Sequence, residues 1–225
     1  MSISSTFIHI KELLNNDQLS NIKNLLASAP YDDGKNTATD SARDVKSNLQ
    51  VNMQSQQYGM IQQILLGALN QSETFRNALY PKNIYPFLIS KYTSGNEYGW
   101  HVDNPLMGNM MRTDVAMTIF LNDPEEYEGG ELELETPSGT LLYKLKKGDA
   151  ICYPCMYLHR VKQLTSGERH VAVTWIQSLV KGNEERGILY DMQQVLNTLK
   201  KSASNSREQL VLQQSHSNLL RKWSE

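Results

Sequence analysis

The sequence predicts a mainly β protein with flanking helices, and three observations support this. Short segments of alternating or β-branched apolar residues recur between residues 84 and 178. Turns that contain glycine or proline separate these segments at intervals of roughly 8–12 residues, which is typical of a β-sandwich or barrel. Before and after this region, apolar residues recur at helical spacing instead. A double-sheet jelly roll is the form we expect, because it leaves few exposed strand edges.

The region before the strands predicts two helices and a long loop. Apolar residues at helical spacing place the helices at residues 16–29 and 55–71. Residues 31–47 are polar and contain an Asp-Gly turn signal, so we expect a loop between the helices. Loops of this length in a compact domain are often lids or binding loops. Residues 1–80 are therefore expected to be a helical region with a loop that packs on the β core.

The β core itself is expected at residues 81–178. The clearest strand pattern lies at residues 114–122, where apolar residues occupy every second position. The strands that we expect are residues 84–92, 114–122, 131–135, 141–145, 150–153, 159–163 and 170–177.

Residues 179–225 return to helical spacing and form an expected C-terminal helical extension. One apolar face runs from Ile188 to Leu199, and another runs from Leu212 to Trp223. These two helices could pack on the β core or on another subunit. The sequence is therefore compatible with a monomer and with a homo-oligomer.

Composition and charge narrow the classes of partner and the compartment. The chain has 225 residues, 40% hydrophobic residues and a net charge of −2, as expected of an ordinary globular protein. A nucleic-acid partner is not expected, because the basic residues do not gather on one face. No signal-peptide pattern and no apolar run near 18 residues is found, so we expect a cytoplasmic protein without a membrane anchor.

A His-x-Asp step, His101 and Asp103, is the first candidate for chemistry. In an extended segment, residues i and i+2 point to the same side, so the imidazole and the carboxylate can share one cation. A third ligand is needed, and His159 and His170 are the candidates. Two histidines and one carboxylate form the facial triad of non-heme Fe(II) oxygenases. The alternative for an isolated His-x-Asp step is a hydrogen-bonded surface pair.

Arg169 favours His159 as the third ligand. An arginine that points into a β core needs an anion, because an unpaired buried charge costs about 3–5 kcal/mol. Neighbouring strand residues point to opposite faces, so His170 would then face away from the core. A guanidinium binds a carboxylate bidentately, and a ligand that spans metal and arginine has the shape of 2-oxoglutarate. Alternatively, Arg169 could pair with a surface carboxylate such as Glu168 or Glu131.

Five separated motifs stand out in the sequence: HVDN at 101–104, YEGGEL at 127–132, KGDAICYP at 147–154, LHRV at 158–161 and GERHVAVTWIQS at 167–178. Together they resemble one known family, the PKHD-type hydroxylases. This family belongs to the prolyl 4-hydroxylase-like branch of the Fe(II)/2-oxoglutarate dioxygenases, and its fold is a double-stranded β-helix, a cupin-like jelly roll. Upstream segments, DGKNTAT and VKSNLQV, resemble the N-terminal region of the same family.

The resemblance implies a set of site residues and a reaction. His101, Asp103 and His159 would bind Fe(II), and Arg169 would hold the distal carboxylate of 2-oxoglutarate. Tyr92 stands where related prolyl hydroxylases have a tyrosine whose hydroxyl also reaches that carboxylate. The implied reaction consumes 2-oxoglutarate and O2, releases succinate and CO2, and hydroxylates a C–H bond. Ascorbate is a candidate additional cofactor.

The substrate side is less defined by the resemblance. Tyr98 and Trp175 occupy positions that line the substrate pocket in prolyl hydroxylases, although aromatic residues beside a β core are more often part of the core. The implied substrate is a peptide, a protein or a free amino acid. Cys152 and Cys155 form a CxxC step without the second pair that a zinc ribbon needs, so a redox role for them stays open.

Two other functions remain as alternatives. One is oxidative demethylation, for which nucleic-acid demethylases of the superfamily generally show a second arginine six residues after the first. Trp175 stands at that position here. The other is a non-catalytic cupin-like binding module, which would hold a metal through a different, histidine-rich cluster.

Overall fold

Two antiparallel β-sheets form the core of the protein. The structure, a computed structural model, describes residues 6–108, 110–202 and 206–225. The larger sheet contains, in order, β1 (Ile8–Ile10), β14 (Ala150–Pro154), β10 (Val115–Phe120), β16 (Leu164–Ser178), β6 (Leu88–Thr93), β4 (Leu49–Val51) and β2 (Tyr31–Asp33). β5 (Pro81–Ile84) and β11 (Tyr127–Gly129) also pair with β16. The smaller sheet contains β13 (Gly139–Tyr143), β12 (Leu132–Thr136), β15 (His159–Val161), β7 (Glu97–His101) and β3 (Lys46–Ser47), and β8 (Leu106–Met107) pairs separately with β9 (Met111–Arg112).

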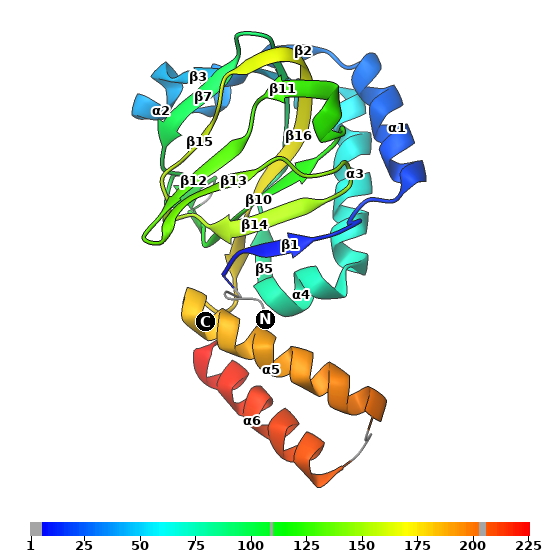
Figure 1. The fold of residues 1–225 in the computed structure, drawn as a ribbon, viewed down its shortest axis with the longest axis vertical. Coiled ribbons are helices and arrows are strands. Elements are labelled where there is room, and N and C mark those ends of the chain that lie inside the picture. Colours follow the sequence, from blue (N-terminus) through cyan, green and yellow to red (C-terminus); the bar gives the residue numbers. More distant parts are fainter. Residues whose placement is uncertain (1–5, 109, 203–205) are drawn as a thin grey trace.

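Helices cover one face of the larger sheet and one end of the β core (Figure 1). Side-chain caps start four of them, at Asn15, Ser55, Ser72 and Ser206, whose side-chain oxygens accept hydrogen bonds from the first turn. The helices are α1 (Asn16–Ala27), α2 (Asp40–Asp44), α3 (Gln56–Gln71), α4 (Glu73–Leu79), α5 (Asn183–Ser202) and α6 (Arg207–Trp223), with short 3-10 turns η1 (Gly34–Thr37) and η2 (Pro124–Glu126). Figure 1 shows α1, α3 and α4 beside the larger sheet, and α5 and α6 as a hairpin below it.

Strand β10 illustrates how the two layers of core are built. Met117 and Ile119 pack with the helices that cover the larger sheet. Ala116 and Phe120 face the opposite way and pack with residues of the smaller sheet. Burial on both faces explains why every residue of β10 is buried. The second of these cores lies between the two sheets, and the pocket described below opens into it.

The predicted jelly roll is confirmed, but the predicted loop at residues 31–47 is wrong. This segment contains β2, η1, α2 and β3, and its strands join both sheets. The strands are too short to show a period of two, and their partners are distant in the chain: Lys46 pairs with Tyr98. The expected strand at residues 84–92 is also divided into β5 and β6, because Pro86 has no N–H to donate to the sheet.

Among the helices in the described part of the chain, none is both long and apolar enough to cross a membrane.

Candidate metal centre

His101, Asp103 and His159 come together where two neighbouring strands of the smaller sheet, β7 and β15, end and begin. His101 ends β7 and is the cross-strand partner of His159, which begins β15. Their ring centroids are 4.2 Å apart. Asp103 follows two residues after β7, and its Oδ1 lies 3.6 Å from Nε2 of His159. One ligand atom from each residue lies within 4.8 Å of the others, so these three side chains can hold a metal ion.

Backbone carbonyls orient both imidazoles. Nδ1 of His101 lies 2.8 Å from the carbonyl oxygen of Gly99, and Nδ1 of His159 lies 3.1 Å from that of Tyr157. A carbonyl only accepts hydrogen bonds, so each Nδ1 carries the proton and donates it. Each Nε2 therefore keeps a lone pair for a metal, which is the arrangement that metal-binding histidines usually show.

The charges at this site also fit a cation. Burial, together with the neighbouring His159, lowers the pKa of His101 to about 3, so the imidazole is neutral near pH 7. Oδ2 of Asp103 is buried and has no hydrogen-bond partner among the described residues. A buried carboxylate oxygen without a partner is costly, and a bound metal would satisfy it. The donor set of two imidazoles and one carboxylate suits Fe(II).

Arg169 points into the same pocket from the larger sheet. It lies on β16, directly across from Tyr92 on β6. Its exposed fraction is only 1%, and its guanidinium lies 5.1 Å from the ring centroid of Tyr92 and 5.7 Å from that of Phe120. Nε and Nη1 have no hydrogen-bond partner in the described part of the chain. His170, the next residue, faces the other side and lies 3.2 Å from Glu168. The guanidinium is therefore free to bind an anion.

Three aromatic residues named by the sequence analysis line this pocket with the triad. Tyr98 stacks on His101, with ring centroids 3.6 Å apart, and thereby fixes that imidazole from one side. Burial raises the pKa of Tyr92, so its hydroxyl keeps a proton that it can donate to a carboxylate. Nε1 of Trp175 is buried without a partner among the described residues. The pocket therefore offers several donors that protein atoms leave unused.

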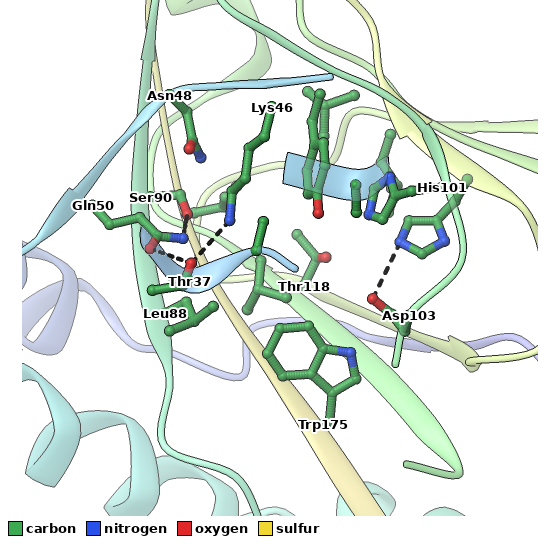
Figure 2. Close-up of a pocket in the computed structure, with 18 of the residues that line it drawn as sticks. Thr37, Lys46, Asn48, Gln50, Leu88, Ser90, His101, Asp103, Thr118 and Trp175 are labelled. Atoms are coloured by element: carbon green, nitrogen blue, oxygen red, sulfur yellow. Dashed lines mark hydrogen bonds and ion pairs between the residues drawn. The ribbon is translucent and has the colours of Figure 1, made fainter. Parts of the chain in front are cut away.

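A polar wall of the pocket was missed by the sequence analysis. Lys46, Asn48 and Gln50 occupy every second position across β3 and β4, so all three side chains line the pocket. Figure 2 shows them at one end of the pocket with Thr37, while His101 and Asp103 lie at the other end. The alternation of polar residues in Lys-Ser-Asn-Leu-Gln-Val was the available signal.

The two cysteines lie in and just after β14, outside the group of metal ligands. Cys152 and Cys155 are both free and buried. Burial raises the pKa of both thiols, so they are protonated at neutral pH. Nucleophilic or redox reactivity requires the thiolate, and the fold does not favour that form here.

Comparison with known proteins assigns the chain to a class that uses such a site. The sequence model of the 2OG-Fe(II) oxygenase superfamily matches residues 87–177, and that of the PKHD-type hydroxylase C-terminal domain matches residues 183–225. The protein is therefore a 2-oxoglutarate- and Fe(II)-dependent oxygenase, an enzyme that uses Fe(II), 2-oxoglutarate and O2. The predicted enzyme class is confirmed, and so is the predicted use of Fe(II), 2-oxoglutarate and O2.

Relatives define the family more closely. The chain is 40% identical over 221 residues to a PKHD-type hydroxylase of Thermosynechococcus vestitus, and the matched residues cover 97% of this chain and 99% of the relative. It is 42% identical over 219 residues to a PKHD-type hydroxylase of a Synechococcus strain, and the matched residues cover 96% of this chain and 98% of that relative. The chain belongs to the PKHD-type hydroxylase family, as the motifs predicted.

Solved structures with low sequence identity support the fold. A prolyl-4-hydroxylase of Pseudomonas putida has a TM-score of 0.55 at 13% identity, over 77% of this chain and 92% of that one. A prolyl hydroxylase of Trichoplax adhaerens, solved with a peptide of a hypoxia-inducible factor, has a TM-score of 0.59 at 16% identity, over 82% and 87%.

Proposed function

We propose that this protein hydroxylates a C–H bond of an amino-acid side chain, in a peptide, in a protein or in a free amino acid. The observation that carries the proposal is that a candidate metal site and an unpaired guanidinium lie within one pocket. Three metal-ligand side chains lie at one end of the space between the sheets, and the unpaired guanidinium of Arg169 lines the same space. The fold shared with two prolyl hydroxylases, one of them solved with a peptide, supports an amino-acid substrate.

In this proposal, five residues hold the metal and the co-substrate. His101, Asp103 and His159 bind Fe(II) through two neutral imidazole nitrogens and one carboxylate oxygen. Arg169 and the hydroxyl of Tyr92 hold the distal carboxylate of 2-oxoglutarate. The protein supplies a preformed site, because the imidazoles are fixed by carbonyls and the guanidinium is fixed between aromatic rings.

The bound iron and 2-oxoglutarate supply the oxidising chemistry, which yields succinate and CO2 and leaves one oxygen atom of O2 on the substrate carbon. The chain's own residues orient the reactants and exclude water. Leu88, Val171 and Val173 give the pocket an apolar wall between the sheets. We assign Tyr98 and Trp175 to the substrate side, because Tyr98 covers His101 and both aromatic side chains line the pocket.

The proposal also assigns parts of the chain. Residues 81–178 carry the metal ligands and Arg169, residues 1–80 add strands and a pocket wall, and residues 179–225 form a helical extension.

A turnover screen tests the proposed function. Purified protein with Fe(II), 2-oxoglutarate and ascorbate is incubated with amino acids, peptides and cell extract, and products are analysed by mass spectrometry. We expect at least one compound to gain one oxygen atom, which becomes labelled when 18O2 is supplied. The Asp103→Asn variant is the control and should give no such product. Loss of a methyl group, without a hydroxylated product, would instead indicate demethylation and would contradict the proposal.

A further inference from the structure

Lys46 is a buried cation in the pocket that the proposed roles leave unexplained. Its exposed fraction is 4%, and its Nζ lies 5.0 Å from the ring centroid of Tyr98. Nζ donates a hydrogen bond to Oγ1 of Thr37 at 3.0 Å. Among the residues whose side chains are described, none has a carboxylate within ion-pair distance of this ammonium. An ammonium has three donors, so Lys46 keeps donors for a ligand.

A hydrogen-bonded frame fixes the position of Lys46. The hydroxyl of Thr37 lies 2.7 Å from Oε1 of Gln50, and Nε2 of Gln50 lies 3.4 Å from the hydroxyl of Ser90 (Figure 2). This frame joins η1, β4 and β6, and so holds the ammonium on elements of the core. Such a preformed cation is typical of a binding site, because no reorganisation is needed when an anion arrives.

The charges of the proposed iron and co-substrate are balanced without Lys46. The charges of Fe(II) and Arg169 are balanced by Asp103 together with the two carboxylates of 2-oxoglutarate. Both ends of 2-oxoglutarate then have partners, one on the metal and one on Arg169. Lys46 remains as an additional buried positive charge whose only hydrogen-bond partner in the described structure is a neutral hydroxyl. Buried charges are normally paired, so the complete complex lacks one anion.

The ammonium is charged at neutral pH despite its burial. Burial lowers the pKa of Lys46, and the more distant carboxylates of Asp103 and Asp33 partly offset this effect, so the pKa is about 8. Asn48, two residues after Lys46, lines the same wall of the pocket. Both polar atoms of its side-chain amide are buried without partners among the described residues. Lys46 and Asn48 therefore present a cation and an amide donor on one side of the pocket.

We propose that Lys46 binds a carboxylate of the hydroxylated substrate, so that the substrate is a carboxylic acid. This inference rests on the proposed hydroxylase function and narrows its substrate class. The carboxylate belongs either to a free amino acid or to an acidic side chain of a peptide. A backbone segment without an acidic group does not satisfy the unpaired ammonium.

Binding measurements with matched ligand pairs test this role without turnover. The anaerobic protein, loaded with Fe(II) and 2-oxoglutarate, is titrated with free L-amino acids and with their carboxamides. Capped peptides with a central Glu or Asp are compared with the same peptides containing Gln or Asn. Wild type, Lys46→Met, Lys46→Gln and the surface control Lys11→Met are measured by calorimetry. Lys46→Gln keeps a hydrogen-bond donor towards Thr37, so it removes the charge with little change to the frame.

We expect wild type and Lys11→Met to bind at least one carboxylate more tightly than its amide. Both Lys46 variants should lose about 10- to 100-fold in affinity for that carboxylate, as for a charge-assisted hydrogen bond. Their affinities for the amide and for 2-oxoglutarate should stay unchanged, which shows that the pocket is intact.

Three results would overturn the inference. The first is that wild type shows no preference for any carboxylate over its amide, and the second is that the preference persists in both Lys46 variants. Alternatively, the loss can fall on 2-oxoglutarate affinity, which would assign Lys46 to the co-substrate. Release of succinate by wild type without added substrate is measured in parallel. Because that release tests only the oxygenase chemistry, failure of the Lys46 role is distinguishable from failure of the proposed function.

Discussion

Replacing Arg169 by Met should separate stability from co-substrate binding. Met has a comparable length but no charge, so it fills the space between Tyr92 and Phe120 without the guanidinium. In the ligand-free protein, Arg169 is 1% exposed, with Nε and Nη1 unpaired. Most buried arginines are paired, and removal of such a residue usually destabilises a protein. Here the pairing is expected only after the co-substrate binds, so the ligand-free protein should lose little stability or gain some.

The magnitude follows from the contacts of the guanidinium. An uncompensated buried charge costs about 3–5 kcal/mol, and the two cation–π contacts return about 0.5–2 kcal/mol each. We therefore expect the free energy of unfolding of ligand-free Arg169→Met to lie between about 1 kcal/mol below and about 4 kcal/mol above that of wild type. For wild type, 2-oxoglutarate at about 100 times its dissociation constant adds about 2.7 kcal/mol. That corresponds to about 5–10 °C in Tm for a protein of this size.

Thermal and urea unfolding under anaerobic conditions with Fe(II) measure both effects. Wild type and the exposed-surface control Arg207→Met should show the rise in Tm with 2-oxoglutarate, and Arg169→Met should show none. The reasoning is refuted if Arg169→Met is several kcal/mol less stable without ligand and still gains the full shift in Tm with it. That pair of results would mean that Arg169 is satisfied within the protein.

Three further predictions concern the metal site and its surroundings. Asp103→Asn should weaken Fe(II) binding by at least about 100-fold in equilibrium dialysis, since even outer hydrogen-bond partners of metal ligands contribute about 10- to 100-fold; equal binding would exclude Asp103 as a ligand. The pKa of His101 is lowered from 6.5 to about 3 in the folded, metal-free protein, so the unfolded chain takes up a proton more readily between these pH values. Stability should therefore fall as the pH falls below about 6.5, by at most about 1.4 kcal/mol per pH unit from this group, and His101→Gln should flatten the slope in urea titrations; an identical slope in both proteins would argue against it. A methyl group on Gly130, which has a φ of 67°, would lie 3.0 Å from Cδ of Arg169, so Gly130→Ala should lose about 1–3 kcal/mol of stability and weaken 2-oxoglutarate binding. The control Gly59→Ala, in open space on α3, should gain about 0.5–1 kcal/mol in the same thermal assay, and equal effects of the two substitutions would contradict the crowding argument.

The sequence predicted those parts of the molecule in which local pattern and chemistry coincide. β10 shows the period of two that its residues predict, and α1 begins at Asn16, the first residue of the predicted helix. The step from His101 to Asp103 is local, so two of the three metal-ligand candidates could be recognised together. His159 was preferred to His170 as the third ligand because of Arg169: if its guanidinium points into the core, His170 on the same strand faces away.

The polar wall of the pocket could not be predicted in the same way. β3 and β4 are two and three residues long, too short for periodicity to distinguish them from a loop. Their conformation depends on β7 and β6, which follow tens of residues later in the chain. From the sequence alone, Lys46 in particular is expected to be a surface residue, since lysines are rarely buried. Only the tertiary contacts with Thr37 and Tyr98 reveal it as a pocket residue.

Succinate release from 2-oxoglutarate tests the central claim most directly. Wild-type protein with Fe(II), ascorbate and O2 should release succinate even without added substrate, and omission of iron should stop the release. His159→Ala should release none, whereas Lys11→Met should match wild type. Succinate release that is equal in wild type and His159→Ala, or that is unaffected by removal of iron, would contradict the assignment of this pocket as an Fe(II)/2-oxoglutarate site.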